Sequence, residues 1–201
     1  LRVAPDSKFV LYIQSDPRAG AIKGALLPYA TVNTLPEPKN ASQKFVALKA
    51  GERVAALAVV ASAADEPDYG LDINLWDDSP SAWGKTYGFG TLPFGNPALS
   101  FSTQAPFHMA FMHESRVLYL AAPFLKRTFP RLRTYQYSTL AALAFRTGHP
   151  YWGWRFTGLA LHYLQDLTQP YHSSLAPAES TAKLLWANAL AMAGMHSMKD
   201  D

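Results

Sequence analysis

The amino-acid sequence predicts a mainly α-helical fold with a long irregular insertion rich in Gly and Pro. Apolar residues recur at helical spacing in the second half of the chain, and Pro falls between these segments rather than inside them. Hydrophobic residues make up 49% of the 201 positions and charged residues only 16%, as expected for a folded protein with a sizeable core. We therefore interpret residues 1–201 as a single domain.

The first half of the chain contains one predicted strand, one predicted helix and the insertion. The segment KFVLYIQ (8–14) is apolar and predicts a short strand, or apolar packing, before the turn at Asp16-Pro17. The segment AGERVAALAVVASAADEPD (50–68) is rich in Ala and predicts a helix that Pro67 stops. Residues 65–107 show neither a helical nor an alternating period, and long loops of this kind tend to be functional or mobile.

The second half predicts four helices separated by Pro or Gly. HMAFMHESRVLYLAAPF (108–124) forms a helix ending near Pro123, and RLRTYQYSTLAALAFRTG (131–148) forms the next. Apolar residues then recur at helical spacing from Trp152 to Leu167, which predicts a third helix. A last helix is predicted from about Ala178 to Met198, entered by Pro177.

Composition excludes some kinds of site and partner. The chain has no Cys, so disulfides and thiolate metal sites are absent. The net charge of +3 is compatible with a phosphate-bearing substrate but does not require one. The longest apolar run, residues 54–64, is shorter than the roughly 20 residues of a transmembrane helix. The first residues, LRVAPDSK, lack the pattern of a signal peptide.

Three polar residues interrupt the apolar stretch FTGLALHYLQDLTQPYHSS (156–174). His162 and Asp166 lie four residues apart, so on a helix they share a face. Pro170 would end that helix, and His172 could then turn back toward the same place. Imidazole nitrogen and carboxylate oxygen both bind zinc, so the trio predicts most of one metal site. A pair of this kind is also found as a simple ion pair on a helix surface.

The stretch LHYLQDLTQPYH resembles the H-x-x-x-D-x-x-x-P-x-H signature of the zinc-dependent phospholipase C family and the related single-strand-preferring zinc nucleases. The likeness covers about 40 residues well, from YSTLAALAFRTG through the signature, and the remainder only at points. It implies an α-helical domain with a cleft that holds two to three Zn²⁺ ions. His162, Asp166 and His172 would be ligands, with Asp166 as the bridging carboxylate.

The resemblance also implies an Asp in a loop, followed by a His. The segment EPDYG is similar to the context of that Asp, which assigns Asp68 as a ligand and candidate general base, with Asp65 as the alternative. The His is assigned to His108, with His113 as the alternative; the family has a much shorter gap here. The His-x-x-x-Asp pair that the resemblance implies on a later helix is matched by His196 and Asp200, with a polar helix end as the alternative interpretation.

One departure separates this sequence from the family pattern. The family begins with a Trp whose amino group binds zinc, whereas residue 1 is Leu and no His precedes His108. The resemblance implies a zinc-dependent phosphodiester hydrolase, secreted or periplasmic, acting on a phospholipid with peripheral membrane contact, or on single-stranded nucleic acid. The alternative is a non-catalytic protein that retains a structural zinc site.

Overall fold

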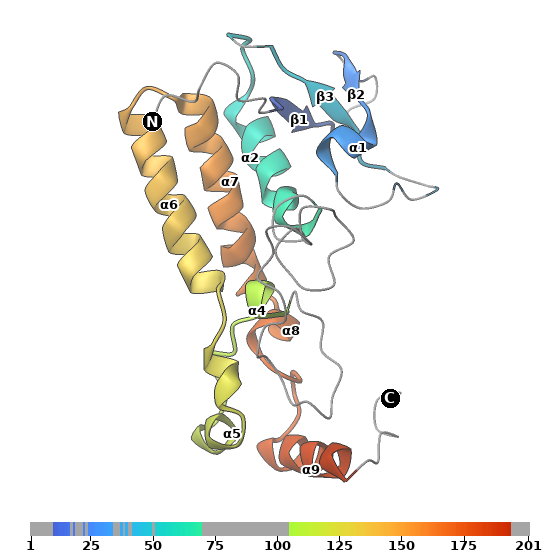
Figure 1. Ribbon diagram of the computed structural model, residues 1–201, viewed down its shortest axis with the longest axis vertical. Helices are drawn as coiled ribbons and strands as arrows, with labels where there is room; N and C mark the ends of the chain where they lie inside the picture. The colour runs from blue at the N-terminus through green and yellow to red at the C-terminus, as the bar shows by residue number, and fades with distance from the viewer. Residues whose placement is uncertain are drawn as a thin grey trace.

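The computed structural model describes residues 10–69, apart from 17, 19–21, 23, 34–36, 38, 40, 41 and 50, and residues 105–193. Three helices stand side by side, a small sheet lies against one end of them, and shorter helices continue below the other end (Figure 1). The protein is mainly α-helical, as predicted. In the described residues, no helix has both the length and the apolar character needed to cross a bilayer.

The three packed helices are α2, α6 and α7, and α7 lies between the other two (Figure 1). The segment predicted over residues 131–148 forms α6 (Pro130–Arg146), and the next forms α7 (Pro150–Asp166). Each begins with a Pro, whose fixed φ suits the first helical position and whose missing N–H costs nothing there. Their shared core is built around Tyr163, which is fully buried and stacks on Tyr137 with ring centroids 6.0 Å apart.

The helix predicted over residues 50–68 is shorter than expected. It forms α2 (Ala56–Asp65), which ends just before Glu66-Pro67, and Pro67 lies inside the 3-10 turn η1 (Glu66–Asp68) that follows. Gly158 lets α2 approach α7 closely. A Cβ at this position would collide with the Val60 carbonyl oxygen and would lie 2.7 Å from the Ala63 Cβ.

The sheet has the strand order β1-β3-β2 and is antiparallel throughout. The predicted strand in residues 8–14 is β1 (Tyr12–Gln14), which pairs with β3 (Phe45–Ala47); β2 (Leu26–Leu27) pairs with the other edge of β3. The short helix α1 (Tyr29–Val32) follows β2. The backbone N–H of Gln14 donates to Ser62 Oγ at 2.6 Å and so ties β1 to α2.

The helix predicted over residues 108–124 is wrong. The chain forms α4 (Ala105–His108), then non-helical backbone, then α5 (Arg116–Ala121) and the turn η3 (Pro123–Lys126). Ser115 starts α5 because its hydroxyl accepts a hydrogen bond from the Leu118 N–H at 3.2 Å. Between α4 and α5, the Ala110 N–H donates to the His172 carbonyl at 2.8 Å, a pairing that a continuous helix would forbid.

The remaining helices follow α7. Pro170 does not end α7, which stops at Asp166; instead it begins the single turn α8 (Pro170–Ser173). The last predicted helix forms α9 (Thr181–Met192), which starts three residues after Ala178, a residue with a φ of 70°. Most of the predicted insertion, residues 70–104, lies outside the described residues, as do the first residues of the strand segment.

Candidate metal centre

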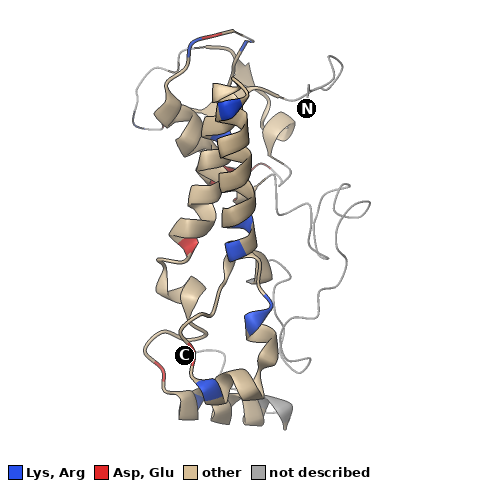
Figure 2. Cartoon of the chain, turned by 90° about the vertical axis from the view of Figure 1, so that its left-hand side faces the viewer, with Lys and Arg blue, Asp and Glu red and all other residues tan. Residues whose placement is uncertain are grey.

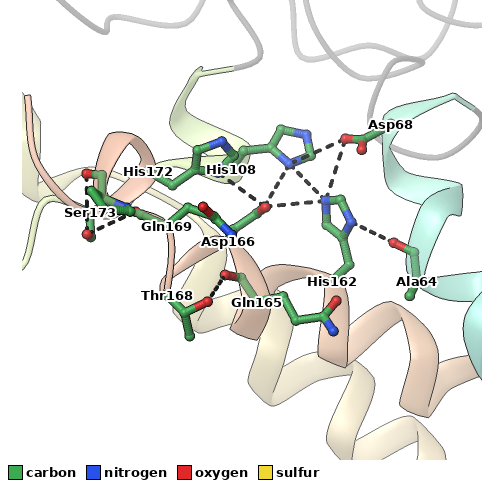
Figure 3. A network of polar contacts seen from close by, with 11 residues as sticks. Ala64, Asp68, His108, His162, Gln165, Asp166, Thr168, Gln169, His172 and Ser173 are labelled. Carbon is green, nitrogen blue, oxygen red and sulfur yellow. Dashed lines mark hydrogen bonds and ion pairs between the residues drawn. The ribbon is translucent and has the colours of Figure 1, made fainter.

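His162 and Asp166 occupy the last turns of α7 and point toward the same place (Figure 3). His162 is 7% exposed, and its Nε2 lies 3.3 Å from Asp166 Oδ2. The Asp166 side chain is also largely buried. The pair is therefore not the exposed ion pair of a helix surface, because both side chains face the interior of the protein.

The orientation of the His162 ring is set by the end of α2. Its Nδ1 lies 2.7 Å from the Ala64 carbonyl oxygen, which can only accept a hydrogen bond. Nδ1 therefore carries the proton, and in the neutral ring the lone pair of Nε2 faces Asp166. A hydrogen bond of this kind is a common support for a metal-binding His, since it fixes both the tautomer and the ring plane.

His108, at the end of α4, is the His that reaches this place from the distant part of the chain. It is 6% exposed, and its Nδ1 lies 3.1 Å from Asp166 Oδ2 and 3.0 Å from His162 Nε2. The neighbouring Phe107 is fully buried and stacks on Phe129, with ring centroids 5.1 Å apart. This packing anchors α4 to the start of α6.

Asp68, the last residue of η1, also lies near these imidazoles. Its Oδ1 lies 3.6 Å from His162 Nε2 and 3.9 Å from His108 Nδ1, while 64% of its side chain is exposed. Partial desolvation raises the pKa of the Asp68 carboxyl above its usual value; the two imidazoles oppose this rise and the Asp166 carboxylate adds to it. Because so much of the side chain is exposed, solvent screens the shift.

His172 approaches the other oxygen of Asp166. Its Nδ1 lies 3.2 Å from Asp166 Oδ1, on the single turn α8 that Pro170 begins. This nitrogen is buried and makes no hydrogen bond within the described residues. Asp166 thus offers Oδ2 to His108 and His162, and Oδ1 to His172. Asp166 therefore approaches all three imidazoles of the cluster.

The distances suit a metal ion. The ligand atoms of Asp68, His108 and His162 all lie within 4.8 Å of one another, a grouping that could hold an ion. Asp166 Oδ2 lies beside this group, 3.1 Å from His108 Nδ1 and 3.3 Å from His162 Nε2. Ligands about 2.0–2.2 Å from a tetrahedral zinc ion lie roughly 3.3–3.6 Å apart, which is close to the 3.6 Å from Asp68 Oδ1 to His162 Nε2 and the 3.3 Å from Asp166 Oδ2 to His162 Nε2.

The charges of the cluster also favour a cation. Two carboxylates and the lone pair of His162 Nε2 converge on a small volume, and each of these groups is an acceptor. Such groups repel one another unless a proton or a metal ion lies between them. The donor set of nitrogen and oxygen fits zinc and other borderline divalent metals.

The structure separates the alternatives that the sequence left open. Asp65 Oδ2 accepts a hydrogen bond from Gln14 Nε2 at 3.0 Å, toward the sheet, so Asp68 is the carboxylate at the cluster. His113 is exposed between α4 and α5, so His108 is the imidazole at the cluster. His196 and Asp200 lie outside the described residues.

Two supporting groups were missed by sequence reasoning. The Ala64 carbonyl is a backbone group, so no residue type could have revealed it. Glu66, two positions before Asp68, forms a buried ion pair with Arg155 on α7. The sequence does contain a signal for Arg155, which lies seven residues, or about two helical turns, before His162. The two side chains are therefore expected on the same face of the helix.

Comparison with known proteins adds no relative. No protein-family model matches the chain, and neither a curated protein nor a solved structure matches it significantly.

Proposed function

We propose that this protein is a zinc-dependent phosphodiester hydrolase resembling the phospholipase C family. The observation that carries the proposal is the convergence of three imidazoles and two carboxylates, from four separate elements, around the two oxygens of Asp166 (Figure 3). These five residues are among the seven that the resemblance assigns as ligands, and the other two, His196 and Asp200, lie outside the described residues. The helix predicted over residues 108–124 did not form.

A bound zinc ion would polarise the phosphate oxygens and make water a nucleophile at neutral pH. Asp68 would accept the proton of the attacking water, because it is the exposed carboxylate of the cluster. As the water oxygen bonds to phosphorus, the bond from phosphorus to the alcohol oxygen breaks, and that oxygen takes up a proton. His162 would keep its Nε2 directed at the site through the bond to Ala64.

The exposure of Asp68 also favours catalysis over a purely structural site. A structural zinc ion is enclosed by four protein ligands, whereas a catalytic one keeps a position open. His108 and His162 are buried, but 64% of the Asp68 side chain reaches solvent. A site with one open side is accessible to a substrate.

We propose a phospholipid as the first substrate class to test, with single-stranded nucleic acid as the second. Proteins that bind single strands carry a positively charged groove. In the view of Figure 2, Lys and Arg of the described residues occur at several heights along the molecule. The phospholipid is placed first because the resemblance is to the phospholipase C family.

The proposal is tested with zinc-loaded protein and three substrates: bis(p-nitrophenyl) phosphate, phosphatidylcholine vesicles and single-stranded DNA. We expect hydrolysis of the first two, and its loss in His162→Ala. His113→Ala is the matched control, because His113 is exposed and away from the cluster. Zinc-loaded protein that hydrolyses none of the three substrates would overturn the proposal. Cleavage of DNA alone would replace the lipid substrate by nucleic acid.

A further inference from the structure

A second polar cluster lies on α7, toward its N-terminal end. Arg155 Nη2 donates to Glu66 Oε1 at 2.7 Å, and only 12% and 15% of the two side chains is exposed. The guanidinium also donates to the Tyr151 hydroxyl at 3.0 Å and lies over the Tyr12 ring, 4.7 Å from its centroid. Burial lowers the pKa of Arg155, but the Glu66 carboxylate and the hydroxyls of Tyr12 and Tyr151 together raise it by more, so the guanidinium stays charged.

This ion pair fastens the turn that carries Asp68. Arg155 and His162 lie on one face of α7, about 10.5 Å apart along the axis. His162 binds the carbonyl of Ala64, and Arg155 binds the side chain of Glu66. The chain from the end of α2 into η1 is thus attached to α7 at two points, immediately before Asp68.

Asp68 itself contributes little to its own placement. Its side chain is mostly exposed, whereas its neighbours on both sides are fixed in the core. Pro67 is buried, and Tyr69 is 3% exposed, with its hydroxyl 3.3 Å from that of Tyr12. The position of the Asp68 carboxylate therefore follows from residues 66, 67 and 69 rather than from contacts of its own.

We propose that Arg155 and Glu66 are a positioning pair for the metal centre: they hold η1 against α7 so that Asp68 reaches the metal ion. The inference rests on the proposed function, since it assigns a supporting role toward the same site. Neither residue touches the metal position. Their role differs from that of a general stabilising ion pair, because it acts through Asp68 alone.

A double-mutant cycle with Asp68 tests this role. Zinc affinity is measured by competition with a chelating dye in the wild type, Arg155→Met, Asp68→Asn and the double variant. We expect Arg155→Met to weaken zinc binding about 10-fold to 100-fold, the range for loss of a supporting residue. In the Asp68→Asn background, the same change should alter affinity less than about 2-fold, because the ligand it positions is already lost.

Two further variants control for the loss of a positive charge and for failure to fold. Arg146→Met, at the exposed end of α6, removes an Arg without touching the cluster and should leave zinc affinity unchanged. If Arg155→Met does not fold, the double change Glu66→Met/Arg155→Met leaves no unpaired buried charge and is used in the same cycle. An equal loss of affinity in both Asp68 backgrounds would overturn the inference, since it would show a general structural effect.

Amide hydrogen exchange of the metal-free protein supplies a readout that does not depend on zinc. The Tyr69 N–H donates to the Glu66 carbonyl at 3.2 Å within the turn. We expect Arg155→Met to speed exchange at Tyr69 while α6 keeps its protection. Unchanged exchange at Tyr69 would contradict the positioning role. If Arg155→Met speeds exchange but the wild type binds no zinc, the ion pair does hold η1 against α7. The proposed function is then overturned instead.

Discussion

The two polar clusters on α7 differ in how their charges are balanced. At the Arg155 end, the protein supplies both partners, and the guanidinium and the Glu66 carboxylate lie 2.7 Å apart. At the Asp166 end, two carboxylates meet imidazoles, one of which presents a lone pair because its proton is directed at Ala64. The first cluster balances its charge with its own residues, whereas the second contains a group of ligand atoms that could hold a cation.

The two clusters on α7 are therefore suited to different roles. A buried ion pair whose partners satisfy each other holds elements together, and removing one partner leaves an uncompensated charge. A group of converging acceptors with one exposed member destabilises the protein unless a ligand occupies it, which is typical of a binding site. Each experiment below acts on one cluster or on the packing that joins them.

The largest effect is expected from Asp166→Asn, which keeps the shape of the side chain and removes its charge. Asp166 contacts all three imidazoles of the cluster, so its loss affects every metal position. We expect zinc affinity to fall about 1000-fold, or roughly 4 kcal/mol. Competition titration measures it, and unchanged affinity would show that Asp166 is not a ligand.

Gly158→Ala should break the packing that joins the clusters. The new methyl group would meet the Val60 carbonyl oxygen, which is backbone and cannot move aside. We expect a loss of about 3 kcal/mol in the free energy of unfolding, measured by urea denaturation.

Gly153→Ala is the matched control on the same helix. Its methyl group would meet the ring of Phe145, a partly exposed side chain that can rotate away. We expect a much smaller loss than in Gly158→Ala. Equal losses in the two variants would show that the approach of α2 to α7 does not depend on Gly158.

His108→Ala and His113→Ala compare two imidazoles that the sequence could not distinguish. We expect His108→Ala to weaken zinc binding about 100-fold, at least as much as losing a supporting residue would. His113→Ala should have no effect, because that side chain is exposed and away from the cluster. The titration used for Asp166→Asn measures both, and the reverse order of effects would refute the assignment.

The smallest effect concerns the Arg155 cluster at high pH. Burial, with a contribution from Glu66, raises the pKa of Tyr12 to about 12. The unfolded chain releases this proton near pH 10, so between about pH 10 and 12 the folded state binds more protons and stability falls as pH rises. At pH 11 this group accounts for a loss of about 1.4 kcal/mol.

Denaturation at pH 9 and pH 11 measures this loss in the wild type and in Tyr12→Phe. We expect the wild type to lose more stability than the variant, by about the amount attributed to Tyr12. The same loss in both proteins would show that Tyr12 does not contribute to the alkaline sensitivity.

The long helices and the ligands on α7 could be predicted from sequence because their signals are local. Helical spacing of apolar residues marks α6 and α7, and four-residue spacing places His162 beside Asp166. Strand β1 was predicted from its apolar segment, but β2 and β3 were missed because they are two and three residues long, too short to show alternation. The broken helix around His108 depends on a bond from Ala110 to His172, which lies far along the chain.

The central claim is that one metal ion lies among Asp68, His108, His162 and Asp166. Anomalous diffraction at the zinc edge, from crystals of the zinc-loaded protein, tests it most directly. We expect a peak among the ligand atoms Asp68 Oδ1, His108 Nδ1 and His162 Nε2, about 2.0–2.2 Å from each. A zinc-loaded crystal with no anomalous peak at these atoms, or with zinc bound only elsewhere, would contradict the account.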